Sequence, residues 1–334
     1  MDPKEFQTKK STISSKYKGK IKIKTSDKTL SLKGEKIELK DDEYVKMIGI
    51  TTCQRTPLYC SNKTYEYLLE LTNNLDFIST SILGGELDKM MLVSEATKEK
   101  EKCQFFVKDE IIYLVYGKFP DKKGKWMLEQ IANHYKDIIG NNDPDQLEKF
   151  EKYQIDTKFQ AVMKFILQEY LKLQDVFTDQ EIPYVEDKIR IDYLGLSSMS
   201  IGVISLLLGD ELNVEVPGNF DDPEERREMK ESLLTAKIEA IAANTLGNTG
   251  AVPQWIAVKL GFQNYRFLTF QEFSNNYFLY LLSEGNLEKL KIVENVLEPK
   301  IVDVTQKPFS GNLKPFNKLR KQLKNMFEEN RSFS

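Results

Sequence analysis

Histidine is nearly absent from this sequence. Only one of the 334 residues is a histidine, His134, so neither a histidine metal set nor a histidine–nucleophile pair can be assembled. The three cysteines, Cys53, Cys60 and Cys103, are odd in number and lack the paired spacing of a zinc site. We therefore expect a protein without catalytic residues, cofactor or metal, in a reducing compartment.

Long hydrophobic runs and phosphate-binding motifs are missing as well. The longest apolar run, Ile201–Leu208, is less than half of the roughly 20 residues that a membrane-spanning helix needs. The start, Met1–Glu5, has no signal-peptide core. No glycine-rich stretch matches a phosphate loop or a dinucleotide fingerprint. The net charge of −3 argues against nucleic acid as a partner, and we expect a cytoplasmic protein.

The composition is that of a globular protein: 40% of the residues are hydrophobic and 30% are charged. A chain of this length predicts two domains. Changes in patterning divide it into a basic tail with a possible edge hairpin, a first domain, a second domain, and a linker with a basic amphipathic helix. These parts cover residues 1–43, 44–178, 185–299 and 300–334.

The stretch Val252–Glu284 reads as three short strands in succession. Apolar alternation places the first two at Trp255–Leu260 and Tyr265–Phe270, and a nearly all-apolar run, typical of a strand covered on both faces, places the third at Tyr277–Leu282. Gly, Asn and Ser residues mark the breaks between them. A hairpin and a helix come before the three strands, and another helix follows them. Those elements are predicted at Ile201–Leu208, Glu211–Val216, Pro223–Leu246 and Asn286–Leu297, with Pro299 ending the last helix.

The first half of the chain repeats this order of elements: strand, strand, helix, three strands, helix. One five-stranded antiparallel sheet with packed helices would bury the apolar faces of each half, which predicts an α+β fold. A further long helix, Leu147–Phe177, follows. The repeated elements are expected at Tyr44–Thr52, Pro57–Ser61, Tyr65–Leu83, Met90–Ser94, Cys103–Val107, Ile111–Tyr116 and Trp126–Ile139.

In this order of elements, Tyr44 to Pro299 resembles a known superfamily with a profilin-like fold. The first half is similar to a longin domain. The second half is similar to a roadblock domain or to a second longin domain. The choice stays open because a roadblock domain begins with a helix, whereas Lys188–Leu194 alternates like a strand.

This resemblance implies a non-enzymatic platform that regulates or docks a small GTPase and pairs with a like domain or forms a homodimer. In roadblock-like pairs the long middle helix and the neighbouring strand form the contact, which implies an interface on Pro223–Leu246 and Trp255–Leu260. The alternative is that this face covers its own sheet. The implied interface residues are Met229, Leu233, Ala236, Ala240 and Trp255.

The segment Pro315–Phe327 has the pattern of a basic amphipathic helix. Together with the lysine run Lys9–Lys24, it suggests attachment to an anionic membrane surface. The second functional hypothesis is therefore a membrane-trafficking or tethering scaffold without effect on nucleotide turnover. The candidate membrane-surface residues are Phe316, Lys318, Leu319, Arg320, Lys321, Leu323 and Lys324.

Overall fold

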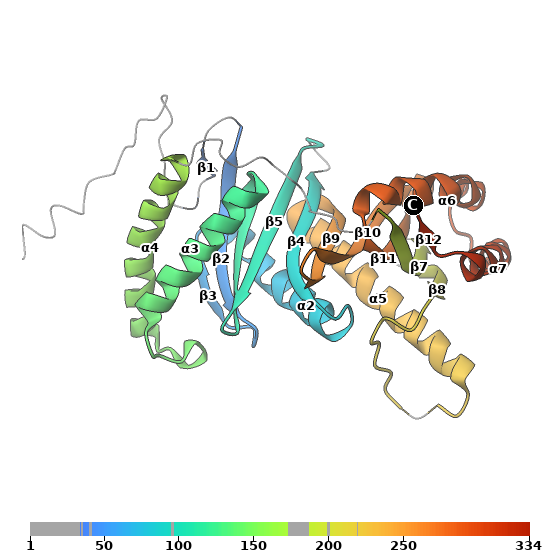
Figure 1. The fold of residues 1–334 in the computed structure, drawn as a ribbon, viewed down its shortest axis with the longest axis horizontal. Helices are drawn as coiled ribbons and strands as arrows, with labels where there is room; N and C mark the ends of the chain where they lie inside the picture. Colours follow the sequence, from blue (N-terminus) through green and yellow to red (C-terminus); the bar gives the residue numbers. More distant parts are fainter. Residues whose placement is uncertain are drawn as a thin grey trace, which may run out of the picture.

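The computed structural model describes residues 34, 36–39, 42–94, 97–172, 187–198, 201–218 and 220–334. This part of the chain forms an α+β fold with twelve strands in one antiparallel sheet and six α-helices (Figure 1). Residues 1–33, which contain the lysine run Lys9–Lys24, and residues 173–186, which contain the predicted boundary between the two domains, lie outside the described residues.

The strands of the first half pair in the order β3-β2-β6-β5-β4, and β1 also pairs with β2. Every pair is antiparallel, and a two-residue turn with positive φ at Asp109 and Glu110 joins β5 to β6. The strands are β1 (Ile37–Glu38), β2 (Tyr44–Thr52), β3 (Pro57–Cys60), β4 (Glu86–Ser94), β5 (Lys100–Lys108) and β6 (Ile111–Lys118).

The second half repeats the same pairing order as β8-β7-β11-β10-β9. A short C-terminal strand adds to the free part of β7. The strands are β7 (Ile189–Ser198), β8 (Ile201–Leu207), β9 (Ala251–Gly261), β10 (Asn264–Phe273), β11 (Tyr277–Gly285) and β12 (Ser332–Phe333).

Two helices cover one face of the sheet, one from each half: α2 (Tyr67–Ser81) and α5 (Pro223–Thr249). Side chains alternate across a strand, so Leu114 of β6 meets these helices while its neighbour Val115 points to the opposite face. The core beneath α2 and α5 is continuous from Met47 to Leu282 and so belongs to both halves.

Two helix pairs cover the opposite face. The pair α3 (Asp121–Ile139) and α4 (Lys149–Lys172) packs on the first half, and the pair α6 (Leu290–Thr305) and α7 (Lys314–Glu329) packs on the second. Each pair has a core of its own, separate from the core under α2 and α5. The sheet is therefore a central layer between two helical layers.

The halves join where β4 pairs with β9, from Glu86↔Lys259 to Ser94↔Ala251. The Cβ position of Gly85 lies 2.5 Å from the Lys259 carbonyl oxygen, so a side chain there would push the two strands apart. The close approach at this seam explains the glycine.

Three predicted elements need correction. The stretch Glu211–Val216 is not a strand; β8 pairs instead with β7, which continues through Gly195 to Ser198. Leu212 and Val214 are buried against the α2–α5 core, which explains the apolar pattern that suggested a strand.

Pro299 lies inside α6 rather than ending it, because Ile301 and Thr305 are buried beyond it. Residues 300–305 are thus helix, not linker.

Candidate interaction surface

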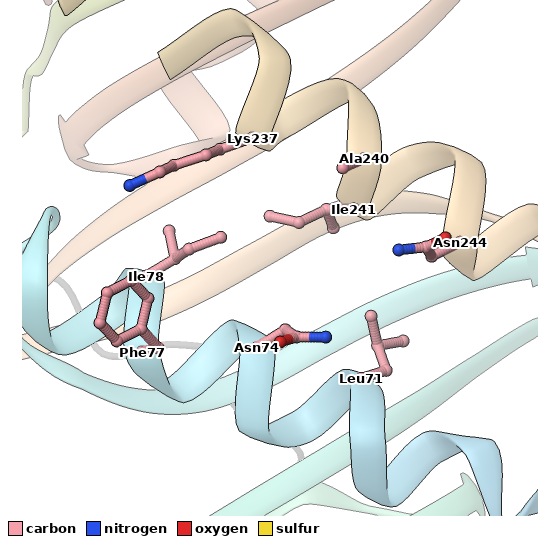
Figure 2. A pocket seen from close by; sticks show the side chains of 8 residues that line it. All are labelled: Leu71, Asn74, Phe77, Ile78, Lys237, Ala240, Ile241 and Asn244. Carbon is pink, nitrogen blue, oxygen red and sulfur yellow. The ribbon is translucent and has the colours of Figure 1, made fainter. Parts of the chain in front are cut away.

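A groove of about 280 Å³ runs between α2 and α5 on the outer side of the shared core (Figure 2). Leu71, Ile78 and Ile241 form its floor and are buried. Asn74 and Asn244 extend into the space between the helices. The groove thus combines an apolar floor with two amides.

Phe77 is the most exposed apolar group at this groove. Its side chain is 53% exposed, and the Lys237 ammonium lies 5.6 Å from the centre of its ring. A cation at that distance is attracted to the aromatic face. Phe77 was not among the predicted interface residues, although the sequence carries a signal for it. An aromatic at position 77 falls outside the apolar stripe of Leu68, Leu71, Leu75, Ile78 and Ile82, so it had no place in the helix's own core.

Local sequence determines where α5 begins and ends. The Asp222 side chain accepts a hydrogen bond from Glu224 N–H, and Pro223 occupies the first turn, where its missing N–H has no cost. Gly250 ends the helix with a φ of 62°. Ala240, exposed at the groove, has a side chain small enough to keep the groove open.

The implied interface residues do not share one surface. Ala240 lines the groove, and Leu233 is partly buried against the α2–α5 core. Met229 and Ala236 are exposed elsewhere on α5. Trp255 is 8% exposed and packs edge-on against Phe267 within the sheet, away from α2 and α5. Trp255 is thus a buried residue of β9, and it lies opposite Met91 of β4 where the two halves join.

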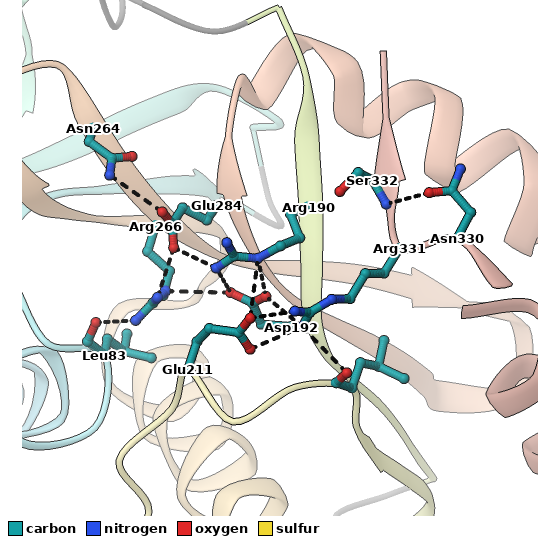
Figure 3. A network of polar contacts seen from close by, with 11 residues as sticks. Leu83, Arg190, Asp192, Glu211, Asn264, Arg266, Glu284, Asn330, Arg331 and Ser332 are labelled. Carbon is teal, nitrogen blue, oxygen red and sulfur yellow. Dashed lines mark hydrogen bonds and ion pairs between the residues drawn. The ribbon is translucent and has the colours of Figure 1, made fainter. Parts of the chain in front are cut away.

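A polar network ties the end of α2 to the second half (Figure 3). Arg266 of β10 donates a hydrogen bond to the Leu83 carbonyl, and it pairs with Glu284 at 2.8 Å and Asp192 at 3.7 Å. Asp192 is fully buried. Arg190 and Arg331 also contact Asp192. The network thus contains three arginines and three carboxylates: Arg190, Arg266 and Arg331 pair with Asp192, Glu211 and Glu284.

Glu211 links the C-terminal residues to this network. Arg331 holds it with two hydrogen bonds, one of them 2.9 Å long. The hydrogen bond from Arg331 lowers the pKa of Glu211 to about 2. Glu211 therefore stays ionised, and it anchors the segment between β8 and α5.

The predicted membrane-surface helix is α7, and its apolar face is not available to a membrane. Phe316, Leu319 and Leu323 are buried in the core with α6 and the sheet. Arg320 points inward and pairs with Glu231 at 2.8 Å. The amphipathic pattern was real, but the sheet covers the apolar face. Lys318 and Lys321 remain exposed, and Lys324 is half-buried.

Among the described residues, no group of three or more His, Cys, Asp or Glu side chains is arranged to hold a metal ion. The helices of the same residues include none with the length and apolar character to cross a membrane. No protein-family model and no curated protein sequence matches this chain.

Proposed function

We propose that this protein is a non-enzymatic binding platform that docks a small GTPase, built from two profilin-like modules of longin or roadblock type. The modules correspond to the predicted domains 44–178 and 185–299, the second extended by the rest of α6 and by α7 to Glu329. The support is topological: the same order of strands and helices, and the same pairing order within the sheet, occur in both halves.

The second module fits the longin alternative better than the roadblock alternative. It begins with the strand β7 rather than a helix. Two helices, α6 and α7, close it, as α3 and α4 close the first module.

The pairing of the halves carries this proposal. The resemblance implies that such a domain pairs with a like domain through its middle helix and neighbouring strand. Here β4 pairs with β9 and α2 lies beside α5 over one core. Each half would thus be the like-domain partner of the other, and a second copy of the chain is not needed for that contact.

The GTPase would dock on the α2–α5 surface. Phe77 offers an exposed aromatic anchor beside a preformed apolar groove, a combination typical of interface hot spots. The platform would act by differential affinity: it would favour whichever nucleotide state of the GTPase fits the groove.

The test is binding of the purified full chain to small GTPases from the same genome, each loaded with GDP or a non-hydrolysable GTP analogue. We expect one GTPase to bind with a preference for one nucleotide state, and Phe77→Ala to weaken that binding about ten-fold or more. Phe150→Ala is the matched control, because Phe150 is 68% exposed on α4, away from the groove.

Nucleotide exchange and hydrolysis rates then separate the two functional hypotheses. A changed rate supports a regulator, and binding without a changed rate supports a scaffold. Equal binding by the Phe77→Ala variant would place the docking site elsewhere, and failure of every GTPase to bind would remove the proposal.

A further inference from the structure

A second groove, of about 590 Å³, lies at the far end of the sheet along β8. Among the strands of the described residues β8 pairs with β7 alone, so its other side is an edge of the described sheet. α5 forms one wall of the groove, and α7 forms the other. The edge strand is thus the floor of a slot between two helices.

At one half of this edge, charged side chains form hydrogen bonds with the backbone groups of β8 that point away from β7. In an antiparallel pair the backbone groups of successive residues point alternately toward and away from the partner strand. The backbone N–H and carbonyl of Leu207 point away from β7. The N–H donates a hydrogen bond to the Glu231 carboxylate at 2.8 Å, and the carbonyl accepts one from the Arg227 guanidinium. The Ser205 carbonyl accepts from Arg320 at 3.1 Å. These contacts block strand addition at Leu207 and at the Ser205 carbonyl, as expected of a protected edge.

The other half of the edge has no such protection. No side chain among the described residues bonds to the backbone of Gly202, which lies opposite Ser197 of β7 just past a register shift, and alternation directs the Ser205 N–H away from β7. Both residues line the groove. Gly202 offers no side chain that would keep another backbone away, and Ile201 beside it is 55% exposed.

The charge of the groove selects the kind of occupant. Glu228, Glu231 and Glu239 line it, and Arg320 is the single basic residue among its lining side chains. Arg320 pairs with Glu231, which leaves two carboxylates without a cation in the groove. The Glu239 Oε1 atom is buried and accepts no hydrogen bond from the described residues.

We propose that this groove binds an extended segment of a partner protein that carries alternating lysine or arginine residues. The segment would add as a short strand to β8 at Gly202–Ser205, and its basic side chains would meet Glu239 and Glu228. Backbone hydrogen bonds would supply affinity and the carboxylates specificity, as in other cases of strand addition. This site is separate from the α2–α5 surface and does not depend on the GTPase proposal.

The probe is a fluorescein-labelled seven-residue peptide of alternating lysine and valine, titrated into the full chain and followed by fluorescence anisotropy. Ala236 is exposed in the groove, so Ala236→Trp should fill the slot and weaken binding at least ten-fold. Ala243→Trp, on an exposed site of α5 outside the groove, should leave binding unchanged. Glu239→Gln should weaken binding about five-fold through the lost charge.

Two modified peptides test the binding mode. A glutamate-for-lysine peptide should not bind, and a peptide with an N-methylated backbone should lose binding because its donors are gone. Amide signals of Gly202–Ser205 should shift in nuclear magnetic resonance spectra on addition of the lysine peptide. Equal affinity of the Ala236→Trp variant, or of the N-methylated peptide, would overturn the proposal. So would shifts at Gly202–Ser205 on deletion of residues 1–33 alone, since the chain's own lysine-rich segment would then be the occupant.

Discussion

Arg266 in β10 donates a hydrogen bond to the main-chain carbonyl of Leu83, a residue 183 positions earlier. Leu83 follows α2 in the first half, so this bond crosses between the halves close to the seam of β4 and β9. Asn213 N–H adds a second link, to the Ile82 carbonyl at 3.2 Å. The halves are therefore joined by strand pairing, a shared core and polar contacts together.

Replacing Arg266 with methionine should destabilise the protein. The change would leave the Leu83 carbonyl without this donor and remove one cation from fully buried Asp192. We expect a loss of about 1–3 kcal/mol in the free energy of unfolding, because Asp192 keeps Arg190. Urea unfolding measures it. Arg226→Ala, at an exposed position of α5, is the control, and equal loss in both variants would contradict a specific role for Arg266.

The Glu211–Arg331 contact predicts an acid-dependent loss of stability. The pKa of Glu211 falls from 4.5 to about 2 on folding, so the folded state favours the ionised form. The resulting stabilisation is present above pH 4.5 and disappears as the pH falls toward 2. Unfolding measured between pH 5 and 2 should show a steeper decline for the natural protein than for Arg331→Gln. Parallel curves would show that the contact does not contribute.

The seam predicts a marked difference between two glycine substitutions. Gly85→Ala would place a methyl group 2.5 Å from the Lys259 carbonyl oxygen, and crowding of this kind costs about 1–3 kcal/mol. Gly247→Ala, in α5 with open space around its Cβ position, should instead raise stability by roughly 0.5 kcal/mol. Thermal unfolding of both variants checks the pair; a neutral Gly85→Ala would mean that the strands can separate without cost.

Leu323 distinguishes a core helix from a membrane-binding helix. It is fully buried in the core of the second half, so Leu323→Ala should lower the free energy of unfolding by about 2–5 kcal/mol in the absence of lipid. The exposed neighbour Lys321 should tolerate alanine within about 0.5 kcal/mol. If Leu323→Ala instead kept full stability and lost only binding to anionic vesicles, the buried position of α7 would be wrong.

Placing a charged side chain in the α2–α5 groove should leave the fold intact. Ala240 is exposed on α5, so Ala240→Glu should change the free energy of unfolding by less than about 1 kcal/mol. The same change should abolish the proposed binding of a small GTPase, because it puts a carboxylate over the apolar floor of Leu71 and Ile241. Circular dichroism and binding measured on one preparation separate these effects; loss of the folded spectrum would count against the groove as an open surface.

Local sequence was enough to predict most of the secondary structure. The nearly all-apolar strand Tyr277–Leu282 and the two strands on either side of Lys108–Glu110 were predicted correctly, and so was the helix containing Leu68, Leu71 and Leu75. Such features depend on residues within a few positions of each other, whose periodicity sets which face is buried. The α+β class followed from the order of these elements.

The tertiary structure decided which surfaces meet. Periodicity shows that α7 has an apolar face, but only long-range packing shows that the sheet covers it. The local pattern likewise predicted Glu211–Val216 as the partner of β8. Instead β8 pairs with β7, and Glu211 is held by Arg331, 120 residues later in the chain. The pairing of β4 with β9 joins segments more than 150 residues apart, and no local pattern encodes such a register, because its free energy comes from the shared core that forms only when both halves are folded.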